Sequence, residues 1–438
     1  METIKAIIKN KELRGKIFYV AFILVIFRLV SHVPVPGPDP ELIRQFISGY
    51  FNQSSALGVY EILTGGGLSK FSILLMGVGP YITASIIMQL LTMVVPSLHA
   101  LSKEGEQGHH KINQYSRYLT VPISIIQGYS MLKIIDNSST AILDGTRLIG
   151  NPGVGTRALM LFATTVGTLF LMWIGELITE KGIGNGVSLI IFAGIVAGLP
   201  VSISNQIKNI TYEGGFTPTI FWKDIGFLVA GALAIFAVVI ITEGVRKIPI
   251  SYAKKVRGNK IYGGMDTHLP VKVNTAGVIP IIFAGAFMSL PQVVGLLSNA
   301  KTAFIANFAK WTQVAFSYGK WPYVVAYFFL IVGFTYFSTF LYFKPDEVSE
   351  NVQKHGGFIP GIRPGRQTAE YLKYVLNRLT LTGSVFLGVI ASMPFFLQYF
   401  TGDPSLTIGG TGLLIVVSVV LETMKKVQAQ LIMRTYEK

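Results

Sequence analysis

Ten apolar stretches, each long enough to cross a lipid bilayer, are spaced along this chain of 438 residues. They lie near residues 17–33, 71–95, 117–135, 156–175, 184–202, 223–242, 274–296, 323–343, 374–397 and 407–424. A helix needs about 20 mostly apolar residues to cross the hydrocarbon, so each stretch is predicted to be one membrane span. No Asp or Glu lies near the middle of any stretch, and this pattern is typical of passive conduits rather than ion-coupled pumps.

The composition excludes the soluble globular class. Hydrophobic residues make up 51% of the chain and charged residues 13%, and the mean hydropathy is +0.53. Backbone groups cannot stay unpaired in lipid, and weak alternation with abundant Gly and Pro favours broken helices over a barrel of strands. We therefore expect an all-α polytopic membrane protein. With no cysteine in the chain, disulfides, thiolate catalysis and cysteine-ligated metals are excluded.

Basic residues are divided unevenly between the two sides of the predicted membrane. The side that holds both chain ends and the even-numbered loops carries 25 of the 37 Lys and Arg residues, and the other side carries 10. The positive-inside rule therefore predicts that both termini are cytoplasmic. The loop 243–273 is especially basic, with Arg246, Lys247, Lys254, Lys255, Arg257, Lys260 and Lys272. Such a loop fits either attraction to anionic lipid or the docking of a large acidic partner.

The segment after the first span is too short to cross the membrane. Residues 57–63 could form two helical turns, but Gly65, Gly66 and Gly67 follow directly. Three glycines end a helix and allow a sharp reversal before a long helix that we expect to begin near Ser72. An ordinary external loop and a re-entrant plug are both compatible with this pattern. The Gly-Lys-Ser/Thr ending of a phosphate-binding loop is missing.

Two pairs of aliphatic residues lie four positions apart beside glycine-rich breaks: Val78 with Ile82, and Val187 with Ile191. Residues at this spacing share one helix face. A narrow aliphatic constriction can exclude water and ions by dewetting, although plain packing between helices gives the same spacing. The polar residues within the spans are mild, and Thr83, Gln127 and Asn274 could either join helices permanently or form a polar seam that separates.

Several motifs together resemble the bacterial SecY family, the protein-conducting subunits of the Sec translocon. They begin at Gly77-Val-Gly-Pro-Tyr-Ile-Thr-Ala-Ser-Ile-Ile-Met-Gln89, Lys103-Glu-Gly-Glu-Gln-Gly108, Gln114-Tyr-Ser-Arg-Tyr118 and Gly182-Ile-Gly-Asn-Gly-Val-Ser188. They continue with His268-Leu-Pro-Val-Lys-Val-Asn-Thr-Ala-Gly-Val-Ile-Pro280, Gly357-Phe-Ile-Pro-Gly-Ile-Arg-Pro-Gly365 and Gly409-Gly-Thr-Gly-Leu-Leu-Ile415. The motifs cover all ten predicted spans in order.

The resemblance implies two inverted halves, residues 1–203 and 204–438, around an hourglass pore. Its aliphatic waist would be formed by Val78, Ile82, Val187, Ile191, Ile282 and Ile415. The family's plug corresponds to about residues 58–70, which include Glu61, Gly65, Gly66, Gly67 and Leu68. Its lateral gate, through which apolar segments leave for the lipid, corresponds to Thr83, Gln127 and Asn274.

The resemblance also implies docking of the motor ATPase SecA or a ribosome on loops 243–273 and 344–373. The corresponding residues are Lys254, Lys255, Arg257, Lys260, Arg363, Pro364 and Gly365. Where the family has two adjacent arginines this chain has Asn259 and Lys260, so one of two charges is missing. The small subunits SecE and SecG are further expected partners, and nascent polypeptides are the expected cargo.

The sequence thus predicts a channel in the bacterial cytoplasmic membrane that translocates unfolded polypeptides and releases transmembrane segments into the lipid bilayer. No enzymatic activity and no cofactor are expected. One alternative is a secondary transporter, whose usual coupling carboxylates are missing from the spans. A second is an intramembrane protease, but all six histidines lie in loops or at span ends.

Overall fold

The computed structural model describes most of the chain. The described residues are 10–39, 41–43, 45–46, 67–68, 70–142, 148–149, 153–212, 218–252, 255–257, 260–262, 266–288, 290–295, 303–317, 320–401 and 407–435. Among the residues singled out above, Glu61, Gly65, Gly66, Lys254 and Asn259 lie outside these ranges.

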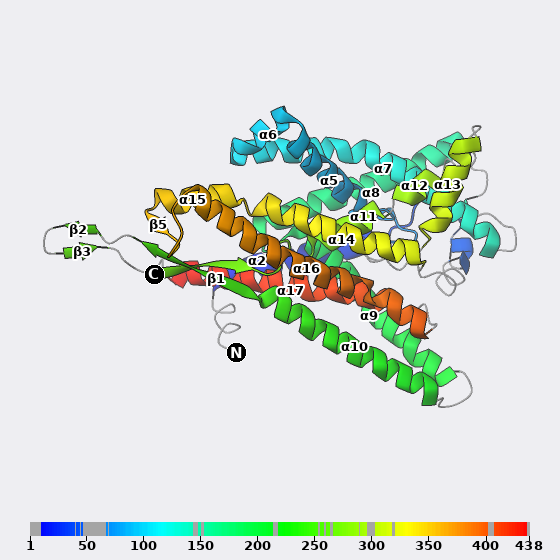
Figure 1. Ribbon diagram of the computed structural model, residues 1–438. Helices are drawn as coiled ribbons and strands as arrows, with labels where there is room; N and C mark the ends of the chain where they lie inside the picture. Colours follow the sequence, from blue (N-terminus) through cyan, green and yellow to red (C-terminus); the bar gives the residue numbers. More distant parts are fainter. Residues whose placement is uncertain are drawn as a thin grey trace.

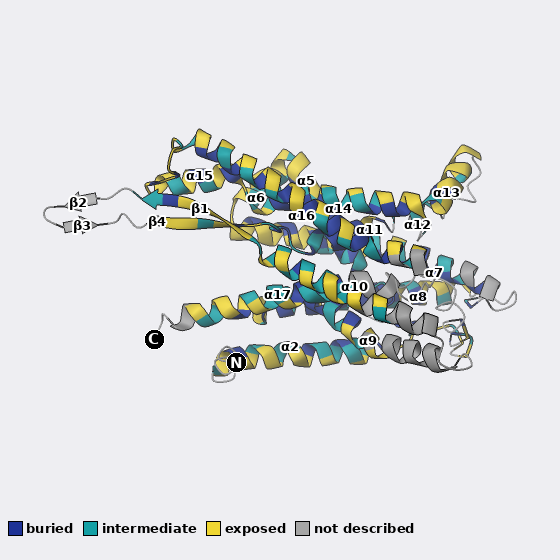
Figure 2. Cartoon of the chain, turned by 60° about the horizontal axis from the view of Figure 1, so that its bottom comes forward, coloured by how far each residue is buried: buried dark blue, intermediate teal, exposed yellow. Residues whose placement is uncertain are grey.

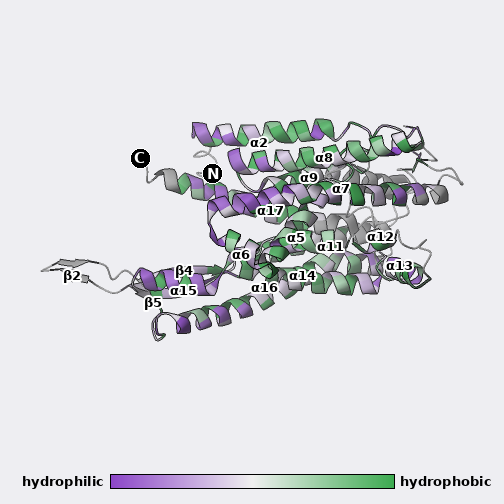
Figure 3. Ribbon diagram, turned by 90° about the horizontal axis from the view of Figure 1, so that it is seen from above, coloured by the Kyte–Doolittle hydropathy of each residue, from purple (hydrophilic) through white to green (hydrophobic). Residues whose placement is uncertain are grey.

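Long helices that lie side by side dominate the structure (Figure 1). They are α2 (Lys11–Val30), α5 (Gly79–Val94), α7 (Glu106–Ile142), α8 (Val154–Lys181), α9 (Gly186–Tyr212), α10 (Pro218–Glu243), α14 (Trp321–Tyr342), α16 (Arg366–Thr401) and α17 (Thr407–Thr435). Shorter helices are α6 (Pro96–Lys103), α11 (Ile279–Phe287), α12 (Leu290–Gly295), α13 (Ala303–Ala315) and α15 (Pro345–Lys354). Hydrophilic residues gather at the end of the bundle where both chain termini and β4 lie (Figure 3).

Within the described residues, four helices are individually long and apolar enough to cross a membrane. These helical segments cover residues 106–136, 154–181, 321–354 and 366–396. A fifth candidate is the pair α5 and α6, whose axes are bent by 99° at Val95. The bent pair has the geometry of a broken span or a re-entrant loop.

The second predicted span begins later than expected. Helix α5 starts at Gly79, whereas the sequence predicted a start near Ser72. Residues 71–78 form turns instead, with positive φ angles at Phe71 (45°) and Gly77 (55°). Pro80 in the first turn of α5 suits a helix start, because its missing N–H is not needed there and its φ angle is already helical.

The seventh predicted span, residues 274–296, is also interrupted. Helix α11 ends at Phe287 and α12 begins at Leu290, and residues 274–278 form a turn before α11. Asn274 therefore precedes the helix on which it was expected. Helix α13, between α12 and α14, was not predicted.

The connections around residues 245–272 and 357–358 form β-strands, so the expectation of a purely α protein is wrong for this region. Strands β1 (Val245–Tyr252), β4 (Asp266–Lys272) and β5 (Gly357–Phe358) make an antiparallel sheet in the order β4-β1-β5. Strands β2 (Lys255–Arg257) and β3 (Lys260–Tyr262) form a hairpin that lies farther from the helix bundle than this sheet (Figure 1). Ile248 and Ile250 alternate with exposed residues along β1, as expected for a strand with one covered face.

Two apolar clusters matter for function. The central cluster lies among the long helices and includes buried residues of α2, α5, α8, α9, α11, α14, α16 and α17. A separate cluster joins β1, β4, the segment after β5 and the start of α16, with α15 packed against it. We call β1, β4, the segment after β5, α15 and the start of α16 the loop unit. In Figure 2 the buried residues lie mostly on the helix faces that are turned toward other helices.

Candidate functional site

Six aliphatic residues from distant parts of the chain belong to the central cluster or pack against it. Val78, Ile82, Ile191, Ile282 and Ile415 are buried members, each no more than 6% exposed. Val187 is partly buried and packs against the cluster. The six come from the start of α5, from α9, from α11 and from α17. The cluster contains many other residues as well, so the aliphatic waist that the family resemblance implies stays a prediction.

The start of α5 positions its pair of residues through backbone hydrogen bonding. Val78 is the residue just before the helix, and its carbonyl accepts a hydrogen bond from the N–H of Ile82 at 3.0 Å. Residues four apart across such a bond lie on the same face. The pair therefore keeps the expected side-by-side arrangement even though Val78 itself is not helical.

The start of α9 is fixed closely against α8. A Cβ atom at Gly186 would overlap the carbonyl of Gly175, so only glycine allows this approach. The N–H of Gly186 donates to Thr179 Oγ1 at 2.9 Å, and that hydroxyl donates to the Gly175 carbonyl at 2.8 Å. Because Val187 follows Gly186 directly, this contact sets the position of the α9 pair.

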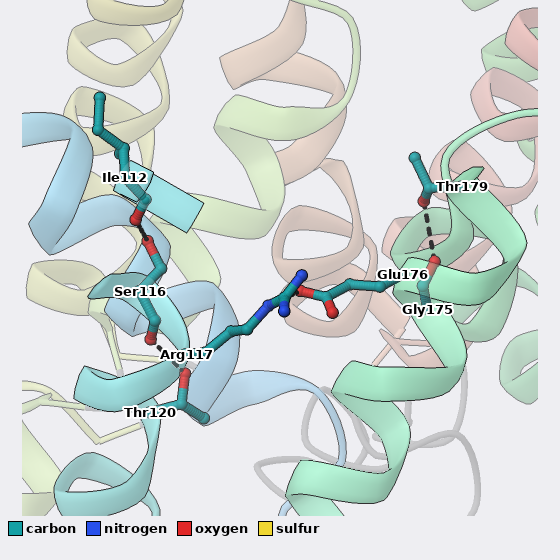
Figure 4. Close-up of polar contacts among 7 residues, drawn as sticks. All are labelled: Ile112, Ser116, Arg117, Thr120, Gly175, Glu176 and Thr179. Atoms are coloured by element: carbon teal, nitrogen blue, oxygen red, sulfur yellow. Dashed lines mark hydrogen bonds and ion pairs between the residues drawn. The ribbon is translucent and has the colours of Figure 1, made fainter. Parts of the chain in front are cut away.

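An ion pair joins α7 to α8 close to the same place. Arg117 Nε donates to Glu176 Oε1 at 2.7 Å, and Glu176 lies next to Gly175 (Figure 4). The sequence alone did not predict this pair, because two residues 59 positions apart leave no local signal. Helices α7, α8 and α9 are thus tied together by polar contacts beside the aliphatic cluster.

The three polar residues expected to meet between helices are only partly brought together. Gln127 Nε2 on α7 donates to Thr83 Oγ1 on α5 at 3.4 Å. Asn274 instead binds its own turn: its amide donates to the carbonyl of Gly277 at 3.2 Å and its Oδ1 accepts from the N–H of Gly277 at 3.0 Å. Helix α5 contacts α11 and helix α7 contacts α12, so these two pairs of helices face each other directly.

The described end of the segment at residues 58–70 packs in a third apolar cluster. Leu68 is buried there with Val35, Phe71, Leu75 and residues of α7 and α8. The Val35 N–H donates to the Phe71 carbonyl at 2.8 Å. Leu68 therefore lies in a cluster distinct from the central one, beside the turns that lead into α5.

The loop around Arg363 holds its backbone firmly and exposes its side chain. Thr368 Oγ1 donates to the Arg363 carbonyl at 3.0 Å, and Ser349 Oγ of α15 donates to the Gly365 carbonyl at 2.7 Å. Gly361 and Gly365 have φ angles of 83° and 96°, which disfavour other residues. The Arg363 side chain and Pro364 are exposed. The backbone of Lys255, Arg257 and Lys260 lies on the β2–β3 hairpin.

No metal site is found in the described part of the chain, where no group of three or more His, Asp or Glu side chains is suitably placed. The features described above are an apolar cluster where separate helices meet, a polar contact between α5 and α7, and a projecting hairpin that carries Lys255, Arg257 and Lys260.

Comparison with known proteins gives consistent matches. The family model named SecY matches residues 72–424. A protein of Bacillus licheniformis described as "Protein translocase subunit SecY" is 43% identical over 440 residues, covering 99% of this chain and 98% of that protein. A protein of Streptomyces galbus with the same description is 40% identical over 434 residues, covering 98% and 97%.

Two solved structures share the fold at low sequence identity. One is described as "The structure of a protein conducting channel", with a TM-score of 0.62 and 16% identity, covering 94% of this chain and 91% of that one. The other is described as "Sec61 in the Canine ribosome-channel complex from the endoplasmic reticulum", with a TM-score of 0.58, 15% identity and the same coverage.

Proposed function

This chain belongs to the SecY family, and from that premise we propose that it is a channel that conducts unfolded polypeptides across a membrane. The observation that carries the proposal is the meeting of Val78, Ile82, Val187, Ile191, Ile282 and Ile415 in one apolar cluster. Relatives at 40–43% identity over almost their whole length are described as protein translocase subunits, which supports the same function here.

The six aliphatic side chains would work as a seal. Water is unstable in a narrow passage lined only by hydrocarbon, so such a passage blocks ions while it is closed. Aliphatic contacts have no preferred direction, so the side chains can move apart around a translocating polypeptide without leaving hydrogen bonds unmade. The plug at about residues 58–70, with Leu68 at its end, would add a second barrier.

The contact between α5–α7 and α11–α12 would serve as the lateral gate. An apolar segment gains free energy by moving from water to lipid, and this gain can offset the loss of weak contacts along the gate. A cysteine pair at positions 83 and 274 tests this role cleanly, because the chain has no native cysteine. Crosslinking should stop the entry of signal sequences, and unimpaired translocation after complete crosslinking would remove the gate from the proposal.

The membrane arrangement we propose has ten spans in two inverted halves, with both termini in the cytoplasm of a bacterial cell and the chain in its cytoplasmic membrane. The excess of basic residues on the side of the termini supports this orientation. On that side the loop unit and the β2–β3 hairpin would receive SecA or a ribosome. SecE and SecG would complete the membrane complex.

The energy for transport would come from the docked partner, because the sequence contains no phosphate-binding loop. The direct test uses proteoliposomes that hold the full chain with its small membrane subunits. Adding SecA, ATP and an unfolded secretory precursor should protect the precursor from external protease, and omitting ATP should abolish the protection. Solute uptake driven by an ion gradient without any motor would favour the transporter alternative and overturn this assignment.

A further inference from the structure

Helix α13 lies at the end of the bundle opposite the β2–β3 hairpin, between α12 and α14. It runs steeply across the direction of α14 (Figure 1). Helix α13 contacts α12. It is therefore attached to the half of the molecule that carries α11, α12 and α14, and it lies outside the helix bundle proper.

The residues of α13 divide into three faces. The face that packs inward carries Ala309, which is fully buried, and Thr312, which is 7% exposed, with Ile305 between them. A polar face carries Lys310 and Gln313, both of them exposed. The third face is exposed and mostly apolar: it carries Phe304, Phe308, Trp311 and Val314, with Asn307 as its one polar residue. Figure 2 shows how much of this helix is exposed.

The exposed apolar face is large and mostly aromatic. Phe304 is 79% exposed and Trp311 is 62% exposed. The rings of Phe308 and Trp311 stack with centroids 6.3 Å apart, and Trp311 meets Phe316 edge-on at 6.4 Å. These contacts hold the rings together on the surface. A patch of this kind marks a surface that is covered by something other than water.

The neighbouring aromatic residues indicate what covers it. Trp321, the first residue of α14, meets Phe396 and Tyr399 of α16 at centroid distances of 6.0 and 6.2 Å. Trp321 and Tyr399 are themselves exposed. Tryptophan and tyrosine at the ends of spanning helices are typical of the boundary between lipid headgroups and hydrocarbon.

Helix α13 ends at Ala315, only six positions before Trp321. Its aromatic face is therefore held near the same boundary. The polar face with Lys310 fits the headgroup side of that boundary, where lysine attracts anionic lipid. Aromatic residues on one face, lysine on another and a helix axis across the spanning direction are together typical of a helix that lies in the membrane surface.

We propose that α13 is a membrane-surface anchor whose face of Phe304, Phe308, Trp311 and Val314 is embedded at the boundary between the headgroups and the acyl chains of the outer leaflet. The inference rests on the membrane location given in the proposed function. Because α13 is attached to α12, the anchor ties the α11–α12 side of the gate contact to the lipid. Movement of that side away from α5 and α7 then moves α13 through the headgroup layer.

The anchor is tested by the fluorescence of Trp311. The chain has four tryptophans, so a variant with Trp173→Phe, Trp222→Phe and Trp321→Phe leaves Trp311 alone. The variant is reconstituted in phosphatidylcholine and phosphatidylglycerol vesicles with any subunits that copurify, and precursor transport is checked first. Lipids brominated on the upper part of their acyl chains should roughly halve the Trp311 emission, because the face is buried only ~5–10 Å into the boundary.

A matched control moves the tryptophan to the polar face of the same helix, through the further changes Trp311→Phe and Gln313→Trp. This tryptophan should be quenched by acrylamide in water and little by brominated lipid. Strong acrylamide quenching of Trp311 itself would overturn the anchor, since the face would then lie in water. Protection from both quenchers would also overturn it, because a protein subunit would then cover the face. If either of these results is obtained while precursor transport is intact, the anchor is wrong and the proposed function still holds.

Discussion

The central cluster and the loop unit are held together in different ways. The central cluster joins helices from both halves of the chain through aliphatic and aromatic side chains. The loop unit has an apolar core too, but a β-ladder from Val245↔Lys272 to Ser251↔Asp266 and the Ser349–Gly365 hydrogen bond hold its backbone. Contacts without direction tolerate rearrangement, whereas hydrogen bonds keep one geometry.

This difference fits the two tasks we propose for them. A seal that must open around cargo benefits from contacts that slide, and a docking surface benefits from a backbone that holds exposed charges in a fixed position. The two kinds of contact are not confined to separate regions. Helices α8 and α9 meet beside the seal through the glycine contact and the Thr179 hydrogen bonds, so part of the central region is also rigid.

The largest effect is expected from Arg363→Glu in the loop unit. Reversing one charge at a docking interface replaces an attraction with a repulsion of about 3 kcal/mol, which corresponds to a loss of transport on the order of 100-fold. The backbone at this position is held by its neighbours, so folding should be unchanged. Initial rates of SecA-driven precursor transport in proteoliposomes measure the effect.

Arg366→Glu is the matched control for this charge reversal. Arg366 is three positions away and equally exposed, and it pairs with Glu370 on its own helix. Surface pairs of this kind contribute little to stability, so transport should stay near the level of the unaltered chain. Equal losses in both variants would mean that overall charge, rather than a defined docking position, governs the interaction.

The next effect is expected from Gly186→Ala, which tests the rigid part of the central region. The new methyl group would overlap the Gly175 carbonyl and must push α9 away from α8. Such overpacking costs about 1–3 kcal/mol, and the unfolding temperature in detergent should fall. Gly198→Ala on the same helix is the control, because no atom lies within 4 Å of its added Cβ. Equal unfolding temperatures would show that the glycine contact is not required.

A smaller effect is expected from Ile282→Asn or Ile415→Asn, which tests the seal itself. An amide in the central cluster stabilises water there, and lowering the barrier by about 1.4 kcal/mol would raise ion leak roughly tenfold. Conductance across planar bilayers measures it. Val325→Asn on α14 makes the same kind of change at an exposed position and should leave the conductance unchanged. If only the Val325→Asn variant leaked ions, the conducting path would lie outside the central cluster.

The sequence predicted the long helices well and their interruptions poorly. An apolar run of sufficient length identifies a buried helix whatever its partners are. The delayed start of α5 at Gly79 and the break between α11 and α12 depend on local turns, which hydropathy does not register. The strands of the loop unit were missed because long apolar runs predict membrane spans and give no signal for short strands, although Ile248 and Ile250 alternate with exposed residues as in a strand.

The candidate site could not have been assembled from spacing alone. Val78–Ile82 and Val187–Ile191 match ordinary helix packing as well as they match a constriction, and the family resemblance was needed to add Ile282 and Ile415. The Arg117–Glu176 pair was missed because its members are joined only in the folded state. Asn274 was expected to bond between helices, and it bonds to Gly277 because its position in a turn brings that backbone closer.

The smallest effect is expected from Val187→Ile, which compares two positions within the seal. Val187 is only partly buried, so one added methylene has room to cover more of the cluster. The additional buried apolar surface should stabilise the closed seal by roughly a few tenths of a kcal/mol, which would lower the resting ion leak by less than about twofold. Val78→Ile is the contrasting variant, because Val78 is 1% exposed at the fixed start of α5. There the same methylene overpacks the cluster, so the leak should rise. If both variants changed the single-channel leak in the same direction, side-chain volume alone would set the tightness of the seal, and the expected difference between its partly buried and fully buried positions would be wrong.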